Sequence, residues 1–439
     1  MKDFSDLSKD QVAELMNRYY DGEKATQLIE EYDLNAQPSN LYKLFPPEVL
    51  DELCEYCHVN LLKPRESKTN QSYHFLNEAK IYCPRCSHKP NISHCNCQNC
   101  IDKARIRREN MVAAIRREYS VEYDPIDYSN LSFKSKVFLG ALVRTVVNED
   151  LYNVIPYDQV SKRVSPTIDL DAEIYKRLHR ERIILVDPSS SIDSFDIQSK
   201  DFPNVFYTFK VKYTLNLLFP TNKNDLFTSI ISPNFYTEDL ADEALKMWRK
   251  IAVQECIEYL EYQLNSVRFE FTPGEKTEAI FNTLLNDFSV SQIYAIIWSC
   301  VAHASRDYQE HRMSKKQAGN SVVSRCQKYG EKAKLSNWDI KKFSRLRDLP
   351  QSELSLYFFN QVVRIGERGF NHAPNLDDLG FNDGEAPQFD ELDHSPEKSL
   401  FPLNDEDEWH SFAEENPFSE DSPSDNEDAS LPEDFEDLF

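Results

Sequence analysis

The stretch that decides the fold reads Cys54-Glu-Tyr-Cys57 and, after 25 intervening residues, Cys83-Pro-Arg-Cys86. Each Cys-x-x-Cys pair forms a knuckle, a tight turn that places two thiolates on one side of the backbone. Two knuckles at this spacing are typical of zinc ribbons, in which four thiolates hold one tetrahedral ion. The spacing therefore predicts a zinc-ribbon-like module over residues 51–102.

Three more thiolates follow the second knuckle, in Cys95-Asn-Cys97-Gln-Asn-Cys100. Three thiolates need one further ligand for a tetrahedral site, and the candidates are His88 and His94. We favour His88, because His94 is adjacent to Cys95 and neighbouring side chains diverge. The resulting eight ligands are enough for two zinc ions and leave no coordination position for water, which favours a structural over a catalytic role.

The sequence leaves the connectivity of the ligands open. The two knuckles either share one ion or interleave with Cys97 and Cys100, and one or two structural zinc ions are expected. The predicted metal ligands are Cys54, Cys57, Cys83, Cys86, His88, Cys95, Cys97 and Cys100.

Cysteine usage and the N-terminal residues both indicate an intracellular protein. Seven of the ten cysteines lie between Cys54 and Cys100, which in a chain that is not secreted favours metal binding over disulfides. The first residues lack the apolar core of a signal peptide, and no apolar stretch is long enough to cross a membrane. We expect a cytoplasmic protein without membrane contact.

The formal charge of −24 is concentrated near the C-terminus. Residues 374–439 hold 23 Asp and Glu against one Lys, a net −22, which leaves −2 for residues 1–373. Such a segment is expected to be disordered, because like charges repel and no apolar face forms. Its last residues, 433–439, resemble the acidic, phenylalanine-terminated tails of bacterial and phage single-stranded-DNA-binding proteins. We expect the tail either to fold back on the basic residues 306–347 and screen them from nucleic acid, or to recruit a protein partner through Phe435, Leu438 and Phe439.

Residues 1–50 are expected to form a small helical unit, which resembles a helix-turn-helix in its spacing. Ser8 and Gln11 form a capping box ahead of a first helix, and a second helix is predicted over 23–32. The third, over 39–45, would be the recognition helix, but Lys43 is its only cation. A helical cap on the zinc module is the alternative to DNA contact.

A basic helix and linker are predicted over residues 103–130, directly after the cysteines. The spacing is helical, and no helix breaker occurs before Pro125. Contact with phosphates is one interpretation, and a solvated helix face is the other. The candidate contacts are Lys103, Arg105, Arg107 and Arg108.

Residues 131–220 follow a pattern that resembles a winged-helix domain. The predicted elements are helices over 135–147, 156–164 and 169–181 and strands over 183–186 and 205–217. Many such domains bind DNA, whereas others bind only proteins. The candidate contacts lie on the third helix and are Lys176, Arg177 and Arg180.

Residues 237–370 are predicted to form a helical domain with a basic region over 306–347. This region holds 12 Lys and Arg against 4 Asp and Glu, with aromatic residues between them. Cations among aromatic rings suit a nucleic-acid strand, although a charged helical surface explains them as well. The candidate contacts are Arg312, Lys315, Lys316, Lys341, Lys342 and Arg345.

No phosphate-binding loop, nucleophile elbow or paired-histidine metalloprotease motif occurs in the sequence. The strongest candidate for a catalytic cluster is His303, Asp307, Glu310 and His311, which would share one helical face. This cluster would make the protein a metal-dependent nuclease, but a polar helix face is the simpler interpretation.

These patterns together predict a mainly α, multidomain protein that contains zinc and binds nucleic acid, with DNA favoured, without being an enzyme. Such a protein would be a DNA-binding regulator or an accessory factor of a mobile element, a phage or a defence system. The alternative is an adapter that binds only proteins through the same modules. The oligomeric state cannot be predicted from the sequence.

Overall fold

The computed structural model describes residues 2–69, 80–146, 152–160, 162–220, 223–233 and 240–379. Within these ranges the chain is mainly helical with few strands, which confirms the predicted fold class at that level. The chain divides into two compact units, Met1–Glu118 and Tyr119–Phe439. No helix of the described ranges is both long enough and apolar enough to cross a membrane.

The first unit begins with a small helical cluster. Its elements are η1 (Phe4–Asp6), α1 (Lys9–Tyr20), α2 (Ala25–Glu31) and the 3-10 helix η2 (Pro38–Leu44). The predicted capping box starts α1, since Ser8 N donates to Gln11 Oε1 over 2.9 Å and Gln11 N donates to Ser8 Oγ over 3.3 Å. The buried core of the cluster consists of Leu15, Tyr19, Leu28, Leu34, Leu41 and Phe45.

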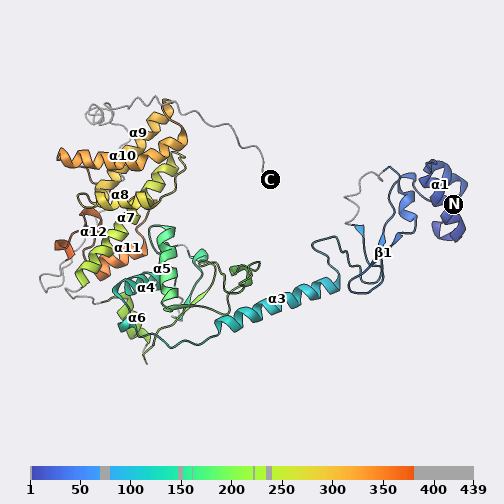
Figure 1. The fold of residues 1–439 in the computed structure, drawn as a ribbon, viewed down its shortest axis with the longest axis horizontal. Coiled ribbons are helices and arrows are strands. Elements are labelled where there is room, and N and C mark those ends of the chain that lie inside the picture. Colours follow the sequence, from blue (N-terminus) through green and yellow to red (C-terminus); the bar gives the residue numbers. More distant parts are fainter. Residues whose placement is uncertain are drawn as a thin grey trace, which may run out of the picture. The chain divides into compact units, whose positions relative to one another are not determined.

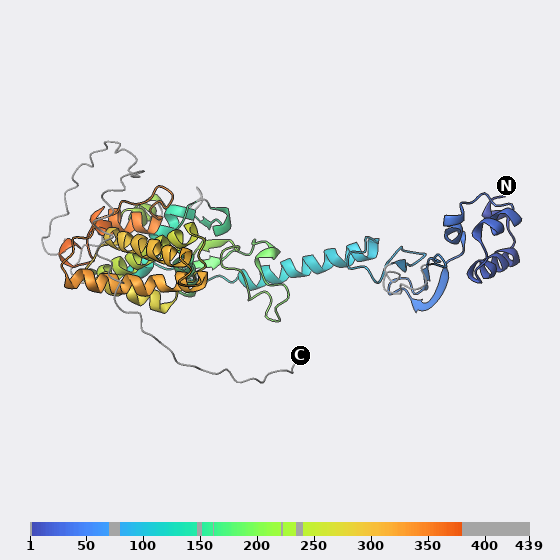
Figure 2. The same cartoon turned by 90° about the horizontal axis from the view of Figure 1, so that it is seen from above.

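A hairpin and a long helix complete the first unit. β1 (Glu48–Leu53) and β2 (Asn60–Lys63) pair antiparallel, with a shift of register inside β1. α3 (Gln98–Tyr119) is one continuous helix in both views (Figures 1 and 2). The helix predicted from Lys103 is confirmed, and it begins early enough that Cys100 lies in its first turn.

The second unit begins with a mixed region of helices and short strands. Its elements are η5 (Tyr128–Asn130), α4 (Phe133–Val146), β3 (Asn153–Val154), η6 (Tyr157–Gln159), α5 (Ile168–Arg180), β4 (Ile184–Val186), η7 (Ile192–Ser194) and β5 (Tyr213–Leu215). The strands form one antiparallel sheet in the order β3-β5-β4. The helices predicted over 135–147 and 169–181 and the strand over 183–186 are confirmed. The winged-helix assignment stays a prediction.

The helix predicted over 156–164 is wrong. Only η6 is helical there, because the backbone becomes extended at Val160. After this extended segment, the backbone N–H of Ser165 donates to Asp171 Oδ1 over 2.7 Å. The turn that precedes α5 is therefore held by a buried carboxylate.

The strand predicted over 205–217 is also wrong over most of its length. Only β5 is a strand, because a turn closed by Lys210 N and Tyr207 O, 2.9 Å apart, interrupts the extended backbone. The alternating rings of this segment pack on a neighbouring helix instead, since Phe209 and Tyr213 both contact the ring of Tyr175. Ring packing and a strand produce the same alternation in sequence.

The remaining helices form the larger part of the second unit. They are α6 (Lys223–Ile231), α7 (Ala241–Ser266), α8 (Glu275–Leu284), α9 (Val290–Gln309), α10 (Lys315–Leu335), α11 (Glu353–Tyr357), the π-helical turn η9 (Phe358–Val362), α12 (Arg368–Asn371) and η10 (Asp377–Leu379). α9 packs against both α7 and α10 (Figure 1). α11 packs against α4, so the two parts of this unit share one core.

The predicted boundary of the disordered tail at residue 374 is wrong. Residues 374–379 are part of the fold: η10 lies there, and Leu379 is 1% exposed. Asp378 holds this segment, because its Oδ2 lies 3.0 Å from His372 Nδ1 and accepts from Asn375 Nδ2 over 2.6 Å. The rest of the predicted tail, residues 380–439, lies outside the described residues.

Candidate metal centre

Four cysteines of the two knuckles come together in the first unit, in a group that we call site 1. Their Sγ atoms lie within 4.8 Å of one another, and those of Cys54 and Cys86 are 3.7 Å apart. A tetrahedral ion with metal–sulfur bonds of about 2.3 Å places its thiolates about 3.8 Å apart, so the group fits such an ion. The members of site 1 are Cys54, Cys57, Cys83 and Cys86.

Each knuckle ends on a residue with a left-handed backbone. The φ angle is 52° at His58 and 58° at Ser87, a conformation that closes the turn. His58 N then donates to Cys54 O over 3.0 Å, and Ser87 N donates to Cys83 O over 2.9 Å. Arg85 N also points at Cys83 Sγ, 3.4 Å away. A backbone donor beside a sulfur stabilises the thiolate, the form that binds metal.

A second group, which we call site 2, lies at the start of α3. Its ligand atoms again lie within 4.8 Å of one another, and His88 Nδ1 is 3.3 Å from Cys100 Sγ and 3.7 Å from Cys97 Sγ. Cys95 Sγ accepts from Lys89 N over 3.2 Å. Because Cys97 and Cys100 flank the first residues of α3, the positive end of the helix dipole favours their thiolates. The members are His88, Cys95, Cys97 and Cys100.

The structure brings together all eight predicted ligands and separates them into these two groups. The donor atoms of the two knuckles lie together in site 1 and apart from those of Cys97 and Cys100, an arrangement without interleaving. His88 joins site 2 and is buried, whereas His94 is exposed. Both groups are closed sets of four donors, so the arrangement can hold ions but offers no open position for a reacting water.

Two residues of the first knuckle reach site 2 and were missed in the sequence, where they are only the variable positions of a Cys-x-x-Cys pair. Glu55 Oε1 lies 3.5 Å from His88 Nε2, and Tyr56 OH lies 3.5 Å from Cys100 Sγ. The hydrogen bond with Cys100, together with burial, raises the pKa of Tyr56. Contact with the Tyr56 hydroxyl, and with Lys103, lowers the pKa of Glu55.

The predicted nucleic-acid contacts on α3 differ in what they touch. Lys103 lies 3.5 Å from Glu55 Oε2, and Arg105 lies 2.9 Å from Glu109 Oε1. Arg107 and Arg108 are exposed, and neither forms an ion pair with any described residue.

Some of the predicted nucleic-acid contacts of the second unit form ion pairs within the protein, and most are exposed. Arg177 lies 2.9 Å from Glu181 Oε1, and Arg312 lies 2.8 Å from Glu310 Oε2. The prediction of Arg345 as a surface contact is corrected, because its side chain is 18% exposed and pairs with Glu255 inside the fold. The exposed members are Lys176, Arg180, Arg312, Lys315, Lys316, Lys341 and Lys342.

The predicted catalytic cluster on α9 does not form. α9 ends at Gln309, and the φ of 59° at His311 takes that residue off the helical face. Asp307 is bound by Arg325, whose Nη2 lies 2.5 Å from its Oδ2. Among the described residues, only sites 1 and 2 bring at least three potential ligands to within ligating distance.

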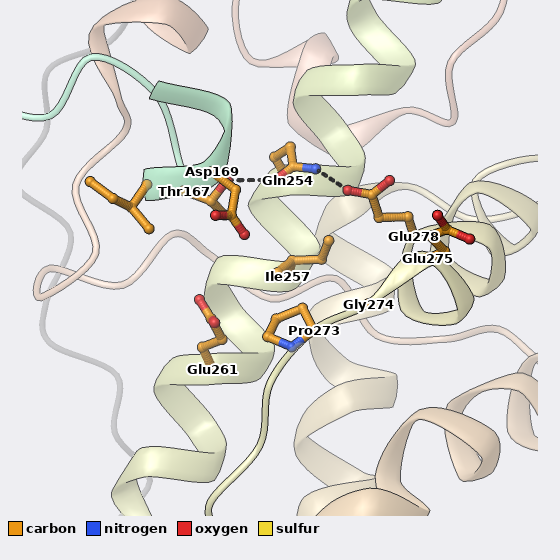
Figure 3. A pocket seen from close by; sticks show the side chains of 10 residues that line it. Thr167, Asp169, Gln254, Ile257, Glu261, Pro273, Gly274, Glu275 and Glu278 are labelled. Carbon is orange, nitrogen blue, oxygen red and sulfur yellow. Dashed lines mark hydrogen bonds between the residues drawn. The ribbon is translucent and has the colours of Figure 1, made fainter. Parts of the chain in front are cut away.

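A pocket of about 210 Å³ opens between α5, α7 and the start of α8 (Figure 3). Gln254 crosses it, accepting from Thr167 Oγ1 over 2.5 Å and donating to Glu278 Oε1 over 3.1 Å. Asp169 and Glu261 also line the pocket, and burial, with the charge of Asp169, raises the pKa of Glu261. These carboxylates do not form a group that could hold a metal. The pocket is a cleft between helices with a largely polar lining.

Comparison with models of known families, with curated proteins and with solved structures finds no match. The two groups of potential metal ligands are the features from which a function can be argued.

Proposed function

We propose that sites 1 and 2 each bind one zinc ion and that the two ions fix the fold of the first unit. The observation that carries this proposal is the gathering of eight potential ligands into two groups of four. Thiolates and imidazole are soft donors that suit zinc, whereas Mg²⁺ and Ca²⁺ prefer oxygen, and neither group contains a carboxylate. The ions supply cross-links between segments whose own apolar core is small.

We further propose that the zinc-held unit presents α3 to the phosphates of a nucleic acid, with DNA favoured. Arg105, Arg108 and Arg116 line one shallow groove along α3 with Val112, Ala113 and Glu109, the carboxylate that pairs with Arg105. At a rise of about 1.5 Å per residue, the first and last of these arginines are about 16 Å apart along the helix. Such a row suits a phosphate backbone, because cations that displace counterions supply most of the affinity.

A binding titration tests the second proposal. The full zinc-loaded chain is titrated against labelled duplex DNA, single-stranded DNA and RNA, with fluorescence anisotropy as the readout, at several salt concentrations between about 50 and about 200 mM. The double variant Arg108→Ala/Arg116→Ala should bind duplex DNA more weakly. Its salt slope should fall by about 0.9 for each phosphate that the variant leaves unneutralised. Equal weakening in this variant and its control would contradict the proposal.

The matched control is Lys9→Ala/Lys24→Ala. Both lysines are exposed in the helical cluster of the same unit, and their replacement removes the same formal charge. The control therefore separates contact by α3 from a general effect of net charge.

An adapter that binds only proteins is the second candidate, and it is favoured by exposed apolar residues on β1. Val49 is 65% exposed and Leu53 is 57% exposed, although both are large and apolar. Exposed apolar side chains on a strand are typical of a protein-binding surface. An adapter would show no salt-dependent affinity for any nucleic acid in the same titration.

A further inference from the structure

We propose that Glu55 and Tyr56 couple the two metal sites, so that an ion in site 1 holds in place the residues that complete site 2. The inference rests on the proposed zinc function and goes beyond it, because it assigns a role to two residues that are not ligands. Both are positioning residues for site 2.

The first contact concerns the imidazole of site 2. His88 directs Nδ1 toward the thiolates of Cys97 and Cys100, so its second nitrogen, Nε2, carries the proton when the ring binds metal. That nitrogen lies 3.5 Å from Glu55 Oε1. A carboxylate at the distal nitrogen orients the ring and raises its basicity, and the loss of such a partner lowers metal affinity by about 10- to 100-fold.

The second contact concerns a thiolate of site 2. Tyr56 OH lies 3.5 Å from Cys100 Sγ and donates to it when the sulfur is ionised. The ring of Tyr56 also packs edge-on against the imidazole of His88, with 4.9 Å between the centroids. Tyr56 therefore contacts two of the four ligands of site 2.

The positions of these two residues depend on site 1. Glu55 and Tyr56 are the residues between Cys54 and Cys57, so an ion that binds both cysteines fixes the backbone on either side of them. Without that ion the knuckle loses the cross-link between its two cysteines, although backbone hydrogen bonds such as Cys54 N to Val59 O over 2.8 Å remain. Glu55 and Tyr56 would then spend less time against site 2.

Charge repulsion between the two filled sites has the opposite effect to these contacts. Whether an ion in site 1 raises or lowers the metal affinity of site 2 therefore distinguishes the two effects. Four thiolates around a divalent ion leave two net negative charges, and three thiolates with an imidazole leave one. Two such sites repel each other, so without bridging contacts a filled site 1 would weaken site 2. Lys103 reduces this repulsion, since its Nζ lies 3.5 Å from Glu55 Oε2 and 5.7 Å from the ring centroid of Tyr56.

A cobalt titration of the full chain tests the proposal. Co²⁺ replaces zinc in tetrahedral sites, and its visible absorption distinguishes four thiolates from three thiolates with an imidazole. The metal-free, reduced protein is titrated with Co²⁺, and the two spectral components are followed separately. The variants are Glu55→Gln, Tyr56→Phe and the double variant, with Glu52→Gln and Tyr42→Phe as matched controls outside both contacts.

In the wild type and the controls, both components should reach saturation. In Glu55→Gln and Tyr56→Phe, the component with one imidazole should need about 10- to 100-fold more free Co²⁺, whereas the four-thiolate component should form as before. Cys57→Ser should weaken the imidazole component as well, although Cys57 is not a ligand of site 2. Cys95→Ser should leave the four-thiolate component in place.

The coupling is refuted if the imidazole component forms equally well in the wild type, the Glu55 and Tyr56 variants and Cys57→Ser. The proposed zinc function would still stand in that case, because both components form. If the wild type gives no tetrahedral cobalt spectrum, the zinc function fails and the coupling fails with it.

Discussion

Arg345 and Glu255 form an ion pair inside the second unit, with 2.8 Å between Nη1 and Oε1 and with side chains that are 18% and 2% exposed. Glu255 Oε1 also accepts from Ser355 Oγ over 2.7 Å, and the guanidinium of Arg345 lies 4.1 Å from the ring centroid of Phe370. The pair joins α7 to the segments that follow α10. A residue expected to contact nucleic acid is thus part of the core.

Removal of Arg345 should therefore destabilise the second unit without affecting nucleic-acid binding. Arg345→Ala leaves the Glu255 carboxylate buried without its cation, which is expected to cost about 3–5 kcal/mol of unfolding free energy. The exposed Lys342→Ala removes the same charge and should change stability by less than about 0.5 kcal/mol. Denaturant unfolding of both variants measures the difference, and equal midpoints would contradict the role of the pair.

A close approach of α4 to α11 predicts a second effect on stability. A Cβ atom added at Gly140 would lie 2.2 Å from Cζ of Tyr357, a ring that is fully buried and whose hydroxyl donates to Ile230 O over 2.6 Å. Because the ring cannot move aside, Gly140→Ala should lower the melting temperature and cost about 1–3 kcal/mol or more.

Gly274→Ala is the control for this variant, since an added Cβ there meets no atom within 4 Å. Gly274 is the N-cap of α8, a position where alanine is less favourable than glycine, so this variant should cost at most about 1 kcal/mol. Thermal unfolding that ranks the two variants in the opposite order would show that the two helices separate easily.

Metal removal should unfold part of the first unit and leave the second unit folded. Among the described residues, the buried core around site 1 consists of Cys54, Leu61, Ile81 and Cys83, which is little apolar surface to hold the segment without a cross-link. Addition of a strong chelator should therefore raise amide hydrogen exchange across β1 and β2, with no change in α7 or α9. Unchanged exchange in the hairpin would show that the hairpin does not need metal.

The buried carboxylate of Asp171 predicts a pH dependence of stability. Burial raises its pKa to about 6 from a usual value of 3.8, although Ser165 N and Tyr157 OH, 2.7 and 2.5 Å away, both donate to it. The folded state therefore binds the proton of the Asp171 carboxyl more tightly than the unfolded state does. The resulting stabilisation of the fold is fully present below the pKa of this carboxyl in the unfolded chain. It is lost as the pH rises from about 4 to about 6, by an amount on the order of 3 kcal/mol.

The matched comparison is between wild type and Asp171→Asn, which cannot titrate at this position. The unfolding free energy of the wild type should fall relative to that of the variant between about pH 4 and about pH 6 and then run parallel. A difference that stays constant across this window would show that Asp171 has an ordinary pKa.

The members of the two candidate ligand groups could be predicted from the sequence because their chemistry and spacing are both local. Cysteine pairs separated by two residues, and a histidine two residues after Cys86, place donors together whatever the rest of the fold does. The division into two sites could not be predicted, since it depends on how the segment around Cys83 folds back on the segment around Cys54. Glu55 and Tyr56 were not found because their roles depend on that same long-range contact.

The incorrect sequence-based predictions for the second unit have a common physical cause. Sequence periodicity reports which side chains are apolar, not whether a neighbouring helix or a neighbouring strand covers them. Phe209 and Tyr213 pack on Tyr175 of α5, and this packing produced the alternation that favoured a strand. The sequence does not reveal that Arg345 is buried, because its partner, Glu255, is 90 residues away in the chain.

The central claim, two zinc ions in two separate groups of four ligands, is tested most directly by counting the metal in the purified full chain. Elemental analysis combined with native mass spectrometry should find two zinc ions per chain in the wild type, and one in a variant that replaces both Cys97 and Cys100 with Ser. Fewer than two zinc ions per wild-type chain, or two ions retained in the variant, would contradict the claim.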